Sequence, residues 1–309
     1  YSYMQFENNY LGIFLGFSGY VIYVLVDSII KKYFVNYYPV IQINFFIYLF
    51  SFIPIIFSLH FISGWKVLIN NKIHIQLLRG VLILICAAII INSFKNHSFS
   101  EIYPILFSTP LILTLLSFFI LKENIGPRRL IAVIVGFIGV LIVSRPGTIH
   151  FTFSLFLLFI GAIILAVNVI LIRRYAKDQS SIAFAFYGLL IGLIISSLIT
   201  TQFYIPLKHN DIYLFFLCGI IAGLGALCIS AASKMLESSL FAPLQYFQLI
   251  AGFIFGYLFF GDLPDYYEVT GSLVISFSGL FIIYRDYQIG KISFSSKATV
   301  SNNIINRDP

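Results

Sequence analysis

Charged residues are scarce in this chain, and their scarcity excludes the soluble globular class. Only 10% of its 309 residues are Asp, Glu, Lys or Arg, whereas 60% are hydrophobic. A soluble domain of this length needs far more polar surface than these side chains provide. The apolar runs reach about twenty residues, which is the length that an α-helix needs to cross a bilayer core. The sequence therefore predicts an integral membrane protein with several spans.

Several chemical signatures are also missing. No G-x-x-x-x-G-K-[ST] loop occurs, so we do not expect the chain itself to hydrolyse ATP as a P-loop machine. The five histidines are scattered without the spacing of metal ligands, and the three cysteines fall within apolar runs. No serine or cysteine nucleophile signature is visible. We therefore expect a protein that is not an enzyme, with no metal and no cofactor.

Ten apolar segments are recognisable, and each is predicted to be a transmembrane helix. They cover residues 10–30, 39–60, 75–94, 99–121, 128–144, 151–172, 182–203, 211–233, 239–261 and 267–284. A β-barrel is excluded because its strands would alternate apolar and polar residues, whereas these segments are continuous apolar blocks. The first segment is preceded by acidic QFENNY and followed by no small-residue cleavage site, so we expect it to be retained as a helix. The expected fold is an all-α integral membrane protein.

Basic residues indicate the orientation, because Lys and Arg accumulate in cytoplasmic loops. With ten helices threaded through the bilayer, fourteen of the nineteen Lys and Arg residues fall on the side of the N-terminus. The five on the opposite side are Lys31, Lys32, Lys95, Arg145 and Lys208. Both termini are therefore predicted to face the cytoplasm. The net charge of +7 follows from this topology, and we expect no nucleic-acid partner.

One unusual segment occurs twice. The run SEIYPILFSTPLILTLLSFFILKEN at 100–124 matches SSLFAPLQYFQLIAGFIFGYLFFGD at 238–262, and each has a proline near its start and an acid at its end. The match pairs Pro104 with Pro243, and further upstream it pairs Lys95 with Lys234. Similar correspondences elsewhere keep a spacing near 140 residues. The chain is therefore interpreted as an internal repeat.

Each repeat holds five predicted helices, the first at 10–145 and the second at 151–285. Because five is odd, the second copy must cross the membrane in the opposite direction. Such an inverted repeat lets two similar halves exchange conformations, which is typical of transporters. Duplication for purely structural reasons is the alternative. The tail at 286–309 is polar, and we predict that it is disordered in the cytoplasm.

The first half resembles the first repeat of the EamA-type drug/metabolite transporter superfamily. The resemblance covers LLRGVLILICAAIIINSFKNHSFSEIYPILFSTPLILTLLSFFILKENIGPRRLIAVIVGFIGVLIV. Its marks are Arg79, Gly80, Lys95, Pro110, Glu123, Gly136 and Gly139. The second half is equally similar to the second repeat over APLQYFQLIAGFIFGYLFFGDLPDYYEVTGSLVISFSGLFIIYRD. It departs at Asp262, where the family more often has Glu, and at Leu249, which stands opposite Pro110.

The resemblance implies a secondary carrier of small metabolites with a central cavity between the repeats. Within the superfamily the chain is most similar to the S-adenosylmethionine uptake carriers of obligate intracellular bacteria. The abundance of Phe, Tyr, Ile and Asn agrees with an AT-rich genome of that kind. A multi-pass protein of the bacterial inner membrane is therefore expected.

Polar residues within apolar spans are the candidates for substrate binding, because burying them costs free energy unless they are paired or used. A cationic nucleoside substrate needs aromatic faces for its charge and base, and amides or hydroxyls for its ribose. The candidates are Tyr20, Asp27, Gln42, Asn44, Asn92, Tyr103, Asn168, Gln245, Tyr246 and Gln248. Gln245 and Gln248 are three residues apart and are expected to share one helical face. Helix–helix hydrogen bonds are the alternative role for each amide.

Three charged residues near helix ends are candidates for gating or coupling. Glu101 is predicted to attract a cationic substrate or to carry a coupling proton, or else to pair with Lys31 or Lys95. Lys95 and Lys234 occupy equivalent positions in the two repeats, on opposite membrane faces, and satisfying helix C-terminal carbonyls is their alternative role.

Three hypotheses for function follow from these patterns. The first is an uptake carrier for S-adenosylmethionine, with exchange for S-adenosylhomocysteine as one mode. The second is an exporter of amino acids or other small metabolites with the same fold. The third is an intramembrane enzyme or lipid scramblase, for which neither convergent catalytic residues nor a polar groove is visible. The small-residue pairs along the helices leave a monomer and a homodimer equally open.

Overall fold

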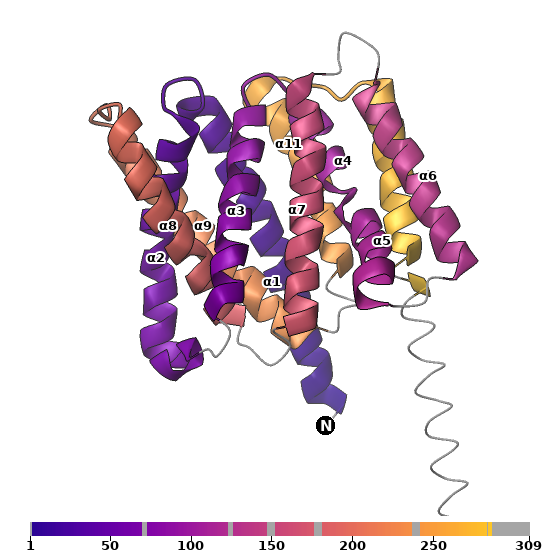
Figure 1. Cartoon of the computed structure of the whole chain (residues 1–309), viewed down its shortest axis with the longest axis horizontal. Helices are drawn as coiled ribbons and strands as arrows, with labels where there is room; N and C mark the ends of the chain where they lie inside the picture. Colours follow the sequence, from indigo (N-terminus) through magenta and orange to yellow (C-terminus); the bar gives the residue numbers. More distant parts are fainter. Residues whose placement is uncertain are drawn as a thin grey trace, which may run out of the picture.

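The computed structural model describes residues 2–69, 73–122, 126–146, 152–175, 181–236, 242–282 and 284–285. All regular structure in these ranges is helical (Figure 1). The first half comprises α1 Ser2–Ile29 with the π-helical turn η1 Ile30–Phe34, α2 Val40–Ser58, η2 Leu59–Ser63, η3 Trp65–Leu68, α3 Ile73–Ser93, α4 Phe99–Leu106, α5 Thr109–Leu121 and α6 Pro127–Ser144. The second half comprises α7 Phe153–Tyr175, α8 Ser181–Phe203, α9 Asp211–Met235, the 3₁₀ segment η4 Ala242–Tyr246, α11 Phe247–Phe260 and a last helix, Tyr266–Ile282.

Ten apolar helical segments are present in the described part of the chain, as predicted. Seven are long and apolar enough to cross a membrane, and three are shorter: Leu130–Ser144, Leu244–Phe260 and Tyr266–Ile282. Large apolar side chains such as Phe119 and Phe277 are exposed on the outside of the bundle, where a bilayer would cover them. The prediction of an all-helical membrane protein is confirmed. The predicted tail at 286–309 lies outside the described residues.

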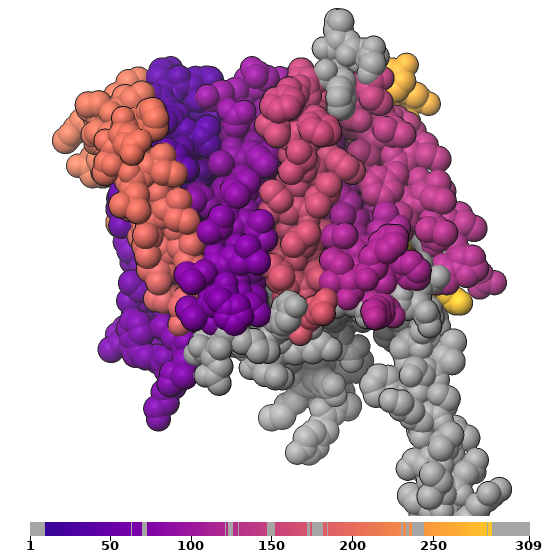
Figure 2. Space-filling view, viewed as in Figure 1, coloured from indigo at the N-terminus to yellow at the C-terminus, as the bar shows by residue number. Residues whose placement is uncertain are grey.

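The two halves run in opposite directions. Lys31, near the end of the first helix, donates a hydrogen bond to the backbone oxygen of His97 (2.8 Å), and the His97 ring lies 2.7 Å from Thr152 Oγ1. Thr152 directly precedes α7, so α1 ends at the face of the bundle where α7 begins. The contacts between helices follow the symmetry of the repeat. In the first repeat α1 contacts α9 and α11 of the second, and its counterpart α7 contacts α3, α4 and α5 of the first. In the space-filling view α8, α3 and α7 lie side by side in one continuous surface (Figure 2).

One predicted helix is broken. Residues 99–121 were expected to form a single helix, but α4 ends at Leu106 and α5 begins at Thr109. Pro110 has no N–H to donate to the carbonyl of Leu106, four residues earlier. The Thr109 hydroxyl donates to that carbonyl instead, at 2.6 Å. At the matching place the second repeat is interrupted in a milder way, because the 3₁₀ segment η4 ends at Tyr246 and passes directly into α11.

Backbone contact between α2 and α9 is expected to depend on Gly223. A Cβ added to Gly223 would lie 2.6 Å from the backbone oxygen of Ser51, which cannot move aside as a flexible side chain could. We predict that Gly223→Ala destabilises the protein by about 1–3 kcal/mol, measured as a lower thermal midpoint of the detergent-purified protein. Gly161→Ala is the matched control, because its nearest atom would be 3.7 Å away. Equal midpoints for the two variants would contradict this account of the packing.

Candidate binding cavity

A cavity of about 560 Å³ lies within the bundle, between the two halves. Helices α1, α2, α3, α4, α7, α8 and α9, with η4 and α11, contribute to its wall, so both repeats enclose it. Cavities of this size are typical of sites for small metabolites. Most of the wall is apolar. Its polar side chains are Tyr23, Asp27, Asn44, Tyr48, Ser51, Tyr103, Thr109, Asn168, Gln245 and Gln248.

Six of the ten candidates for substrate binding belong to this wall. They are Asp27, Asn44, Tyr103, Asn168, Gln245 and Gln248. They come from six separate elements of both repeats, and the structure brings them to one space. Their contact with a substrate stays a prediction.

The remaining candidates lie elsewhere. The Asn92 side chain is exposed, because successive residues of a helix point about 100° apart and α3 presents the neighbouring Ile91 to the cavity. Tyr246 is buried against the backbone of Gly279, with its ring 5.5 Å from that of Phe107. Tyr20 lies on α1 outside the wall. The Gln42 amide exchanges two hydrogen bonds with the backbone of Ile205, which is a structural role.

Two tyrosines that sequence reasoning missed line the cavity. Tyr23 precedes Asp27 by one helical turn, and Tyr48 follows Asn44 by one turn. Residues four apart share a face of a helix, so this spacing was the signal that could have found both of them. The Tyr48 hydroxyl is buried and has no hydrogen-bond partner among the described residues.

Asp27 is the only charged side chain that the described cavity wall contains. Its Oδ2 accepts a hydrogen bond from the Tyr103 hydroxyl at 2.9 Å, which joins α1 to α4. This bond occupies one position on the carboxylate, which has several more lone pairs to offer. Because the rings of Tyr23, Tyr48 and Tyr103 share the wall with this carboxylate, the cavity combines the two groups that attract an organic cation.

The amides of the wall are held in different ways. Asn44 Nδ2 donates to the backbone oxygen of Val40 at 3.1 Å, within its own helix. Asn168 accepts a hydrogen bond from Arg79 Nε at 2.7 Å, which links α7 to α3. Gln245 and Gln248 were expected to share one helical face, but they lie on either side of the junction between η4 and α11, and both line the cavity.

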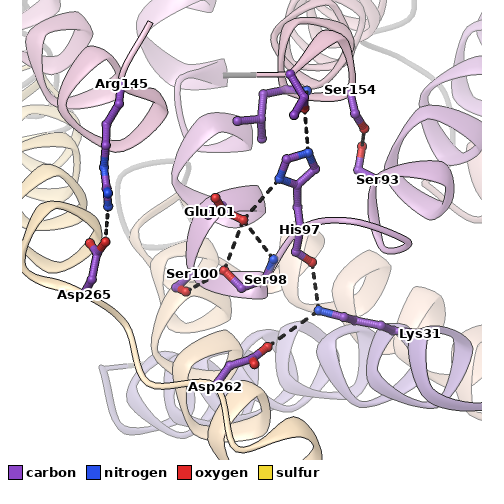
Figure 3. A network of polar contacts seen from close by, with 12 residues as sticks. Lys31, Ser93, His97, Ser98, Ser100, Glu101, Arg145, Ser154, Asp262 and Asp265 are labelled. Carbon is purple, nitrogen blue, oxygen red and sulfur yellow. Dashed lines mark hydrogen bonds and ion pairs between the residues drawn. The ribbon is translucent and has the colours of Figure 1, made fainter. Parts of the chain in front are cut away.

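A polar network, which we call the Lys31 network, lies just outside the cavity at the face where α1 ends (Figure 3). Ile30 and Ile91 belong to the cavity wall, and Lys31 and His97 follow them along the chain toward this face. Besides its bond to His97, Lys31 Nζ lies 3.8 Å from Asp262 and above the rings of Phe99 and Phe260. The network therefore ties the first repeat to the second.

Glu101 belongs to the same network but pairs with a different residue from the one expected. Its Oε2 lies 3.2 Å from His97 Nδ1, and it accepts a bond from the Ser98 backbone N–H at 3.0 Å (Figure 3). Among the described residues no ion pair joins Glu101 to Lys31 or Lys95, the alternative partners expected for it, and Lys95 is exposed. The Lys234 side chain lies outside the described residues. A gating or coupling role for all three stays a prediction.

A second ion pair crosses between the repeats at the same face. Arg145, after α6, pairs with Asp265, before the last helix (Figure 3). Burial would raise the pKa of Asp265, but the bond from the Glu268 backbone N–H and the Arg145 guanidinium together hold this pKa below its usual range. The carboxylate is therefore ionised at neutral pH, and the pair is fully formed.

Comparison with known proteins shows similarity to membrane transporters. The pattern of the EamA-like transporter family matches residues 10–145 and 152–285. The chain is 25% identical over 283 residues to a Rickettsia felis S-adenosylmethionine uptake transporter, covering 90% of this chain and 96% of that one. It is 30% identical over 183 residues to an uncharacterized transporter of Helicobacter pylori, covering 56% and 61%. A known crystal structure aligns with a TM-score of 0.60 at 14% identity, over 87% of this chain and 94% of that one, and so shows the same fold.

The Lys31 network is expected to keep the cavity closed at its face. We predict that Lys31→Ala makes a cysteine placed in the cavity wall at Ala87 react several-fold faster with a membrane-impermeant thiol reagent applied from that face. The background would replace Cys86, Cys218 and Cys228, which are all free. Lys32→Ala is the matched control, because Lys32 is exposed and contacts the rings of Tyr33 and Phe259 instead. Equal labelling rates in the two variants would refute a closing role.

Proposed function

Since this chain belongs to the EamA-like transporter family, we propose that it carries S-adenosylmethionine into the cell by alternating access, with exchange for S-adenosylhomocysteine as one mode. The family consists of carriers, not enzymes. The observation that carries the proposal is the chemistry of the cavity: its single described charge is the carboxylate of Asp27, which shares the wall with three tyrosine rings. The Rickettsia relatives support the same substrate, because their similarity extends over most of both chains.

The parts of the cavity suit the parts of this substrate. A sulfonium and an ammonium group are cations, and a buried carboxylate beside aromatic faces attracts both. The ribose and adenine carry hydroxyl groups, an amine and ring nitrogens, which the amides of Asn168, Gln245 and Gln248 can bind. The apolar remainder of the wall excludes water around the ligand. Tyr20, Asn92 and Tyr246 have no part in this arrangement.

Location and direction belong to the same proposal. We place the protein in the bacterial inner membrane with both termini in the cytoplasm, so that the Lys31 network faces outward. Opening of this network would admit substrate from outside, and its closure would precede release inside. Export of amino acids or other metabolites is the alternative, because the same architecture supports both directions and the Helicobacter pylori relative is identified only as a transporter. A monomer or homodimer in the bilayer satisfies either version.

Uptake of labelled S-adenosylmethionine by bacteria that express the chain tests this proposal. We expect accumulation above the empty-vector level that excess S-adenosylhomocysteine blocks and excess methionine does not. Asp27→Asn keeps the shape of the side chain but removes its charge, so uptake at limiting substrate should fall about tenfold or more. Asp211→Asn is the control, because Asp211 also accepts a bond from a tyrosine, Tyr38, but lies outside the cavity wall. Vector-level uptake with the wild-type protein present in the membrane would overturn the assignment.

A further inference from the structure

A buried guanidinium lies behind the cavity wall. Arg79 is 4% exposed and is not among the residues that line the cavity. Its Nε donates to Asn168 Oδ1 at 2.7 Å, and its Nη1 donates to Gln76 Oε1 at 2.6 Å. An arginine has five N–H donors and no acceptor, so both amides must turn their oxygens toward it. The orientation of these amides is thus a chemical necessity.

The consequence for Asn168 is that its amino group is turned away from Arg79. Asn168 belongs to the cavity wall, and no described residue accepts a hydrogen bond from its Nδ2. An unrestrained asparagine could present either its oxygen or its amino group to a ligand. Held by Arg79, this one presents a donor. The group that this amino group recognises is therefore an acceptor, such as a ring nitrogen, a hydroxyl oxygen or a carbonyl.

Asp27 and Asn168 lie at different depths. Asp27 is seven residues from the end of the first helix at Phe34, which places it about 10 Å from that face of the bundle. Asn168 is fifteen residues from the start of α7 at the same face, which places it about 22 Å away. The Asp27 carboxylate, which attracts a cation, and the Asn168 amino group, which donates to a neutral acceptor, are thus separated by roughly 12 Å along the bundle.

We propose that Arg79 is a positioning residue that, through Asn168, gives the cavity a fixed polarity for an elongated substrate. The cationic end lies at Asp27, nearer the Lys31 network, and an acceptor-bearing end lies at Asn168. This inference rests on the proposed function, and it orients that substrate: the sulfonium and ammonium point toward Asp27, whereas the nucleoside, with its ring nitrogens and ribose oxygens, reaches Asn168.

Asn168→Asp separates this role from a purely structural one. A carboxylate binds Arg79 more strongly than an amide does, so a residue that only satisfies Arg79 would tolerate the change or benefit from it. The proposal predicts the opposite for the ligand, because the donor becomes an acceptor. We expect the KM for S-adenosylmethionine to rise about tenfold or more while the thermal midpoint of the ligand-free protein stays the same or increases.

Comparison with Asp27→Asn tests the orientation. Asp27 should act on the sulfonium charge, so Asp27→Asn should weaken the binding of S-adenosylmethionine more than the binding of S-adenosylhomocysteine, whose thioether is uncharged. Asn168 should act on the nucleoside that both ligands share, so Asn168→Asp should weaken the binding of both ligands to the same extent. Arg79→Lys keeps a donor toward Asn168 and should retain more affinity than Arg79→Gln, whose own amide can turn either way.

The experiment measures uptake kinetics in cells and ligand-induced thermal shifts of the full-length purified protein. The ligands are S-adenosylmethionine, S-adenosylhomocysteine, adenosine and methionine. If the wild type transports S-adenosylmethionine and Asn168→Asp leaves its KM unchanged, the inference fails and the proposed function stands. If the wild type transports none but adenosine still stabilises it, and Asn168→Asp abolishes that shift, the proposed function fails and the inference stands. Binding of none of the four ligands would overturn both.

Discussion

The lack of water within a bilayer is the constraint on which this structure depends. In hydrocarbon each backbone N–H and C=O must find a partner inside the protein, so the chain crosses as helices, and any break must be compensated locally. The break between α4 and α5 is compensated in this way. The Ser108 hydroxyl donates to the backbone oxygen of Ile105 and the Thr109 hydroxyl to that of Leu106, both at 2.6 Å. The same cost keeps polar side chains rare in the spans, and several of those that the structure describes line one cavity.

Symmetry determines where the breaks meet. Phe107 and Tyr246 stand at equivalent positions of the two repeats, each at the point where its helix is interrupted. Their rings lie 5.5 Å apart, so the two interruptions contact one another between the halves. Four of the cavity residues, Tyr103, Thr109, Gln245 and Gln248, flank these two points in sequence. Interrupted helices thus bring binding groups from both repeats to a common place, as is typical of carriers built from inverted repeats.

Most of the fold could be predicted from the sequence, because continuous apolar runs and the doubled segment are properties of the chain itself. The helix break could not. Hydropathy does not register backbone hydrogen bonds, and the second repeat has Leu249 where the first has Pro110, so proline alone did not indicate both interruptions.

For the cavity, the type of residue was a better guide than its position on the helix. Asp27 and Asn168 are polar within apolar spans and were found for that reason, whereas the exposed Asn92 satisfies the same criterion. Tyr23 and Tyr48 were missed because twenty tyrosines are too many to choose among without knowing which helix face meets the cavity. The hydrogen bond between Arg79 and Asn168 joins residues that are 89 positions apart, so no local sequence pattern indicates it.

A structure of the protein with S-adenosylmethionine bound would test the central claim most directly. The account predicts ligand density in the cavity, with the sulfonium within about 4–6 Å of the Asp27 carboxylate and the nucleoside in contact with the Asn168 amide. Density at another site, or a ligand in the cavity with its nucleoside against Asp27, would contradict it.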